Sequence, residues 1–150
     1  MGTPAKTLIL NDIGTTFGTI NVAGGYKTNV TKVQALARGY ADVKTGERPF
    51  LGYVFENEAI QYFAGYIRCT MTVRIIGHVS GQSQSDRASK ITNLYDDIVA
   101  SLSADTTRGA NAISTTFTSL QTDEGDPDGR GDGSLLMNCQ IIYHRPVTSS

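Results

Sequence analysis

Apolar and polar residues alternate along residues 67–79, which read IRCTMTVRIIGHV. One set of alternate positions is apolar: Ile67, Cys69, Met71, Val73, Ile75 and Val79. Between them lie Arg68, Thr70, Thr72 and Arg74. A period of two residues is typical of a strand with one buried face and one solvated face. The pattern therefore predicts a long, half-buried strand here.

A second pattern begins after the polar segment that follows this strand. Apolar residues recur there at three- and four-residue steps: Ala88, Ile91, Leu94, Tyr95, Ile98 and Leu102. This spacing predicts a helix with one apolar stripe, capped at its start by Ser85 or Asp86. We expect this helix to lie on the apolar face of the preceding strand.

An earlier helix is predicted from Ile9, Ile13, Phe17 and Ile20, which are spaced by four, four and three residues. Thr3 is expected to be its N-cap and Pro4 its first helical residue. The sequence Ala23-Gly24-Gly25 is expected to end it.

The remaining alternating segments predict strands at residues 26–36, 50–56, 112–120 and 135–143. Asn57-Glu58 is expected to turn the chain. The long strand is then expected to begin with Tyr62, Phe63, Tyr66 and Ile67, with Ile60 as its earliest start. Residues 37–49 and 121–134 are expected to form loops because they are polar and contain several turn-forming residues.

The order helix, strand, strand, strand, helix, strand, strand predicts an α+β fold. We expect a mainly antiparallel sheet with two helices packed on one face. The 150 residues suit a single domain, in which residues 146–150 form a loose C-terminal tail.

Charge is unevenly distributed although the formal net charge is only −1. The loop at 121–134 has a net charge of −4, from Asp123, Glu124, Asp126, Asp128 and Asp132 against Arg130. A balanced total excludes a general attraction to nucleic acid or to an anionic membrane. The sequence contains no apolar run of membrane-spanning length and no export signal, so we expect a cytoplasmic origin.

The titratable residues form no recognisable catalytic or metal-binding pattern. His78 and His144 lie singly in predicted strands, and Cys69 and Cys139 lie on apolar strand faces, where reduced, buried thiols are expected. A calcium loop starting at Asp126 fails the EF-hand pattern. We expect no enzymatic activity, no metal and no cofactor.

Three stretches carry a family resemblance: Gly25–Val30 (GYKTNV), residues 91–111 (ITNLYDDIVASLSADTTRGAN) and the closing QIIYHR. Together with the order of elements, they resemble tail terminator proteins, also called tail completion proteins, of long-tailed bacteriophages. The resemblance covers roughly residues 5–145. None of these stretches is a reactive constellation.

The resemblance implies a structural virion protein that forms a hexameric ring on the tail tube, stops its polymerisation and joins it to the neck or head. Its implied partners are further copies of itself, the tail tube protein and a neck or head-completion protein, with transient passage of DNA and no membrane. The implied location is the virion tail or neck, after a stage in the host cytoplasm. Two alternatives stay open: another neck or minor tail protein, such as a head-closure protein, and a small cytosolic ligand-binding domain.

The two polar loops are the candidate contact regions. We predict that residues 121–134 project as a mobile hairpin loop, facing either a partner or the DNA path, with a solvated loop of no specific role as the alternative. Its candidate residues are Asp123, Glu124, Asp126, Asp128, Arg130 and Asp132. Candidate subunit contacts are Arg38, Tyr40, Lys44, Arg48, Arg68 and Arg74, although Arg68 and Arg74 also suit solvated charges on the polar face of a strand.

Overall fold

In a computed structural model, residues 4–35, 43–125 and 131–146 are described. The elements follow the predicted order: α1 (Ala5–Phe17), β1 (Lys32–Gln34), β2 (Phe50–Phe63), β3 (Tyr66–Gly81), α2 (Gln84–Ser103), β4 (Ser114–Asp123) and β5 (Gly131–Pro146), with two short 3-10 turns at Val22–Gly24 and Thr45–Glu47. The strands form one sheet in the order β1-β2-β3-β5-β4. Of the strand pairs among the described residues, β1–β2 is parallel and the other three are antiparallel.

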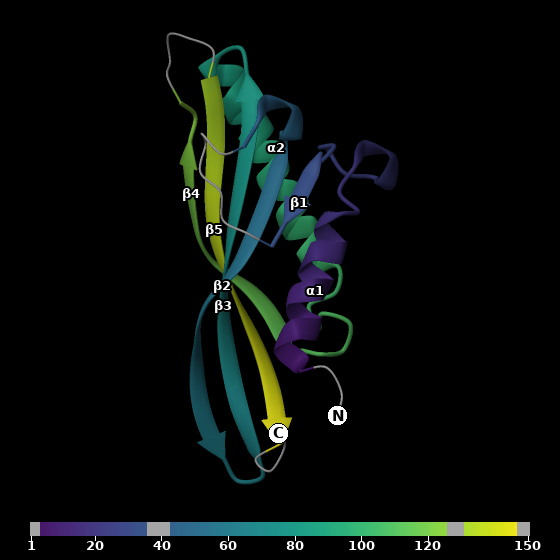
Figure 1. Ribbon diagram of the computed structural model, residues 1–150, viewed down its shortest axis with the longest axis vertical. Coiled ribbons are helices and arrows are strands. Elements are labelled where there is room, and N and C mark those ends of the chain that lie inside the picture. The colour runs from purple at the N-terminus through teal and green to yellow at the C-terminus, as the bar shows by residue number, and fades with distance from the viewer. Residues whose placement is uncertain (1–3, 36–42, 126–130, 147–150) are drawn as a thin grey trace.

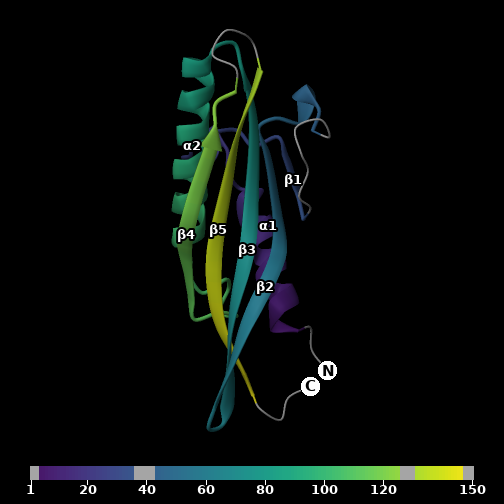
Figure 2. The ribbon, with the colours of Figure 1, turned by 90° about the vertical axis from the view of Figure 1, so that its left-hand side faces the viewer.

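Both helices lie on one face of this sheet, and the opposite face carries no described helix (Figure 2). This confirms the predicted α+β class with a mainly antiparallel sheet. The three strands β2, β3 and β5 extend beyond the helices at one end, where the β2–β3 hairpin forms the tip (Figure 1). The molecule is therefore two layers thick along most of its length and one layer thick at this end.

The predicted apolar rows form the core. Every one of the six alternating apolar positions of β3 is buried, and so is the matching row of β5: Leu135, Met137, Cys139, Ile141 and Tyr143. These two rows lie against the α2 stripe and the buried α1 residues Ile9, Ile13 and Phe17. The two-residue pattern of the strands and the 3.6-residue pattern of the helices thus identify the two surfaces that meet in the core.

Helix α2 lies close to the sheet because two glycines face it. A Cβ atom at Gly77 would lie 2.8 Å from a methyl group of Leu94, and one at Gly133 would lie 2.8 Å from a methyl group of Ile91. The helix is capped by Ser83, whose hydroxyl accepts the Asp86 N–H at 3.1 Å, and not by Ser85 or Asp86 as predicted. The cap lies two or three residues before the predicted positions because the helix begins at Gln84.

The first helix is shorter than predicted. It ends at Phe17, and the chain continues through Gly18 into the short 3-10 turn, so Ile20 is buried without being helical. Pro4 occupies the N-cap position, whereas the predicted cap, Thr3, lies outside the described residues. Of the strand predicted at residues 26–36, only Lys32–Gln34 pairs with the sheet among residues 26–35, and Leu36 lies outside the described residues.

The hairpin between β2 and β3 was misplaced by the sequence pattern. Asn57-Glu58 does not turn the chain: the register shifts between Phe55 and Asn57, which is a β-bulge, and β2 continues to Phe63. The turn occurs at residues 64–65, where Gly65 has a φ of +86°. An extra residue in a strand shifts the alternation of apolar and polar residues by one position. For this reason the sequence pattern indicates two segments where the structure has the single strand β2.

The predicted loop at 121–134 is also shorter. Strand β4 runs to Asp123 and β5 begins at Gly131, so four predicted loop residues at the second end belong to a strand. Residues 126–130 lie outside the described residues. Pro146 is still part of β5, whereas residues 147–150 of the predicted tail are not described.

Replacement of Ile98 by Asp is expected to prevent stable folding. Ile98 is fully buried in the core, and an unpaired carboxylate there costs several kcal/mol, comparable with a total stability of about 5–15 kcal/mol. The matched control is Thr92→Asp, at an exposed position of the same helix, for which a change within about 0.5 kcal/mol is expected. Thermal unfolding followed by circular dichroism compares the two, and similar melting temperatures would contradict the core assignment.

Candidate functional site

The two predicted contact loops meet at an ion pair. Nη1 of Arg48 lies 2.5 Å from Oδ1 of Asp132 and donates to the Ser80 hydroxyl at 3.0 Å. Nη2 of Arg48 donates to the carbonyl of Val43 at 2.7 Å. The Arg48 side chain is only 7% exposed, and that of Asp132 is 34% exposed. These two candidate contact residues are therefore engaged with each other inside the chain.

A buried arginine organises the base of the β4–β5 loop. Arg87 is fully buried, and its Nε donates to the carbonyl of Glu124 at 2.5 Å, while Nη1 donates to the carbonyl of Gly81 at 3.2 Å. Asp123, at the end of β4, accepts the Gly125 N–H at 2.8 Å. Asp123 and Glu124 thus lie at a fixed loop base, whereas Asp126, Asp128 and Arg130 lie outside the described residues.

Arg68 and Arg74 lie on the polar side of β3, as the alternation predicts. Arg74 forms a two-pronged contact with Glu56, at 2.9 and 3.3 Å, with both side chains over a third exposed. Arg68 donates from Nε to Nε2 of His144 at 3.2 Å. Of the other candidate subunit contacts, Lys44 is exposed, and Arg38 and Tyr40 lie outside the described residues.

The tip formed by β2, β3 and β5 carries aromatic side chains. The rings of Phe63 and Tyr66 are stacked with centroids 5.0 Å apart, and Tyr66 lies 4.4 Å from the His144 ring. Tyr62 is 71% exposed and Ile60 is 56% exposed. The sequence pattern did not predict this surface, because it assigned Tyr62, Phe63 and Tyr66 to the start of the long strand. A turn predicted at Gly65 would have placed Tyr62 and Tyr66 on the two strands of one hairpin.

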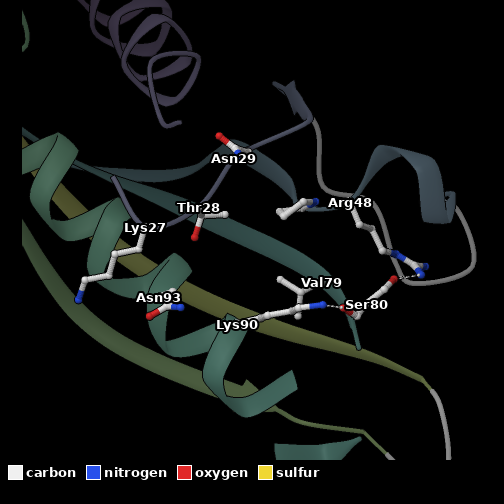
Figure 3. Close-up of a pocket in the computed structure, with 9 residues that line it drawn as sticks. Lys27, Thr28, Asn29, Arg48, Val79, Ser80, Lys90 and Asn93 are labelled. Carbon is white, nitrogen blue, oxygen red and sulfur yellow. Dashed lines mark hydrogen bonds between the residues drawn. The ribbon is translucent and has the colours of Figure 1, made fainter. Parts of the chain in front are cut away.

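A cavity of about 440 Å³ lies between α2, β3 and two loop segments (Figure 3). It is lined by Lys27, Thr28, Asn29, Arg48, Pro49, Val79, Ser80, Lys90 and Asn93. Arg48 and Lys90 both reach Ser80, Lys90 through the backbone carbonyl at 2.8 Å. Each of the three lining cations has a carboxylate partner: Lys27 with Asp96, Lys90 with Asp86, and Arg48 with Asp132. The cavity therefore offers little unbalanced charge for an anionic ligand.

The first two stretches that carry the family resemblance contact each other. The backbone N–H of Lys27, in GYKTNV, donates to both carboxylate oxygens of Asp97 at 3.0 and 3.1 Å. Asp97 is buried on α2 and belongs to the sequence DDI. The side chain of Lys27 pairs with Asp96 at 2.9 Å, and this hydrogen bond raises the pKa of Lys27. These motif residues fix the segment after α1 onto α2.

The D-T-x-x-G turn after α2 holds a second fully buried arginine. Arg108 pairs with Asp12 of α1 at 3.0 Å and donates to the carbonyls of Leu102 and Asp105. Asp105 in turn accepts a hydrogen bond from the Thr107 hydroxyl and others from the N–H groups of Thr107 and Gly109, which lower its pKa to about 2. This turn therefore joins α1, α2 and the start of β4.

The cysteines and histidines are dispersed in the structure as they are in the sequence. Cys69 faces Tyr143 and Cys139 faces Val73 across the β3–β5 pair, so the two thiols are in different rows and form no disulfide. His78 is buried and packs near Phe50, whereas His144 is exposed. Within residues 4–35, 43–125 and 131–146, no three His, Cys, Asp or Glu side chains are grouped to hold a metal ion.

Neither described helix has the length and apolar character needed to cross a membrane. No family model matches the sequence, and a search of curated proteins finds no match either.

Replacement of Asp132 by Ala is expected to destabilise the fold by about 2–4 kcal/mol, because it removes a carboxylate that accepts a hydrogen bond from the nearly buried Arg48 guanidinium. The control is Glu56→Ala, which removes the partner of the half-exposed Arg74 and should cost less than about 1 kcal/mol. Urea unfolding at neutral pH measures both. Equal losses would contradict a special role for the Arg48–Asp132 pair.

Both thiols are expected to be reduced and protected. Burial raises the pKa of Cys69 and raises that of Cys139 from 9.0 to about 12, so little thiolate exists at pH 8. Titration with a thiol reagent should find two free thiols after unfolding without reductant, and almost none before. Because the folded state favours the neutral thiol, stability should fall as the pH rises above about 9. A rapid reaction of the folded protein would disprove this protection.

Proposed function

We propose that the protein is a ring-forming structural subunit of the tail terminator type, which caps the tail tube of a long-tailed bacteriophage, stops its polymerisation and joins it to the neck or head. The observation that carries this proposal is the location of the exposed apolar side chains. Those described are Leu8, Val22, Ile60, Tyr62, Phe63, Ile113 and Leu120. Five of these seven lie on β2 and on or next to β4.

Strands β2 and β4 lie on opposite sides of the β3–β5 pair (Figure 1). Exposed apolar surface of this kind is a common mark of protein–protein contact. Because the two patches are different surfaces on opposite sides of the molecule, each favours contact with the other patch on a second copy. Such head-to-tail contacts close into a ring when the rotation between copies permits it, and otherwise give a filament.

A ring of this kind needs no reactive side chains. Its function would depend on closure, on a surface that fits the last ring of the tube, and on a second surface for the neck or head-completion protein. DNA would pass through the ring without stable binding. The acidic residues at the base of the β4–β5 loop support such passage if they face the channel, because carboxylates repel the phosphate backbone.

The proposal places the protein in the virion tail or neck, after a stage in the host cytoplasm. A head-closure or other minor tail protein is the nearest alternative, since it would use similar edge contacts. The small-ligand alternative receives less support, because each cation that lines the cavity is already paired.

The proposal is tested by mixing the purified protein with tail tube subunits of the same phage. Light scattering should show a closed oligomer, and electron microscopy should show tubes that stop growing once the protein is bound. Leu120→Ser is expected to weaken oligomer formation at least tenfold, since it removes an exposed apolar side chain from the middle of β4. Leu8→Ser, which changes an exposed apolar residue of α1, is the control. A strictly monomeric protein that leaves tube growth unchanged would disprove the proposal.

A further inference from the structure

Two strands of the sheet have a free side along most of their length. Strand β1 pairs with only three residues of β2, Phe50 to Gly52, which leaves the eleven residues from Tyr53 to Phe63 without a described partner strand on their outer side. On the opposite side of the sheet, the ten residues of β4 pair, among the described residues, only with β5. Each of these two strands therefore has a side on which no described strand pairs with it.

The β4 edge lacks the basic and proline residues that often prevent an edge strand from pairing with other chains. Edge strands are usually protected by lysine, proline or other charged groups. The β4 sequence, STTFTSLQTD, contains no Lys, Arg or Pro, and its single charged residue is Asp123 at the very end. A bulge lies between Phe117 and Ser119, and the stretch before it, Ser114–Phe117, is regular and rich in β-branched residues.

The acidic residues of the β2 edge are already engaged within their own sheet. Glu56 pairs with Arg74, and Glu58 accepts a hydrogen bond from the Tyr143 hydroxyl at 2.7 Å. This interaction and burial raise the pKa of Tyr143, so its hydroxyl stays protonated as the donor. Past these carboxylates, the edge consists of the uncharged sequence AIQYF. Neither carboxylate therefore stands as an unpaired charge that would repel an approaching strand.

We propose that residues 114–120 of β4 in one copy pair in antiparallel fashion with the part of β2 that β1 leaves uncovered, residues 53–63, in a second copy, so that one sheet continues from subunit to subunit. This inference rests on the proposed function and specifies the subunit contact. Strands β3 and β4 both run antiparallel to β5, and β2 runs antiparallel to β3. Two copies placed side by side in the same orientation therefore bring β4 next to an oppositely directed β2, which is the more stable pairing.

The side chains on the two edges also match. Within one copy, Phe55 and Phe117 lie in the same cross-strand row, through Val73 and Cys139. Ile60 lies opposite Cys69, in the row that continues to Tyr143 and then to the position of Ile113, one residue before Ser114. Pairing without stagger thus places Ile60 beside Ile113 on the helix-bearing face. A shift by two residues keeps the face and places Tyr62 beside Ile113 instead.

Cysteine cross-linking tests this pairing in the full-length protein. Three variants are needed, Ile60→Cys, Tyr62→Cys and Ile113→Cys, at positions whose side chains are about half exposed or more, so that the fold should be kept. Mixing Ile113→Cys with Ile60→Cys, or with Tyr62→Cys, under oxidation should give a covalent dimer of most of the protein in one of the two mixtures. Each variant alone should give less than a tenth of that yield, because a head-to-tail contact brings no residue next to its own copy.

The control is Ile113→Cys mixed with Leu8→Cys, which should not cross-link because Leu8 lies on α1. Wild-type protein, whose Cys69 and Cys139 are buried, is a second control and should give no covalent dimer. A closed oligomer by light scattering with no cross-link in either mixture would overturn the edge pairing and leave the proposed function standing. A disulfide-linked dimer formed by Ile113→Cys alone would also overturn the edge pairing, because that pairing places Ile113 beside β2 of the second copy and away from the second copy's Ile113. A protein that is monomeric at every concentration would overturn both.

Discussion

The antiparallel pairing of β3 with β5 is the constraint on which the other elements depend. Both strands are sixteen residues long and pair along their entire length, with alternate side chains buried on the same face. That face determines where both helices must pack, and the two strands occupy the centre of the sheet. As a result, β2 and β4 lie on the two sides of this pair, and the exposed apolar side chains gather on strands that still have a free side.

The stretches that suggested a phage protein have structural roles in this chain. Asp97 holds the segment after α1 against α2, and the buried Arg108 ties α1 to the turn before β4. Residues with such roles identify an arrangement of elements more than a binding surface. These stretches therefore hold α1, α2 and the turn before β4 together, whereas the exposed side chains proposed for assembly belong to other residues, above all Tyr62 and Ile113.

The sequence predicted the element order, the fold class and the buried rows of β3, α2 and β5, because each of these depends on a repeated local pattern. It did not predict the course of β2, since the bulge after Phe55 reverses the alternation and mimics a break. It also could not predict that Arg48 reaches Asp132, because the two residues are 84 positions apart and no local pattern encodes the contact. Contacts between distant polar residues depend on the packing of the whole sheet.

The Arg48–Asp132 pair joins the loop segment before β2 to the first residues of β5. A partner that binds more tightly when Asp132 is paired with Arg48 would also stabilise the conformation of residues 43–49. In the same way, a partner that binds residues 43–49 in this conformation would favour the paired position of Asp132 at the start of β5. By thermodynamic linkage, the two effects are equal in free energy. In an assembly whose subunits are contacted from two directions, this pair gives the two polar loops a means of cooperative binding.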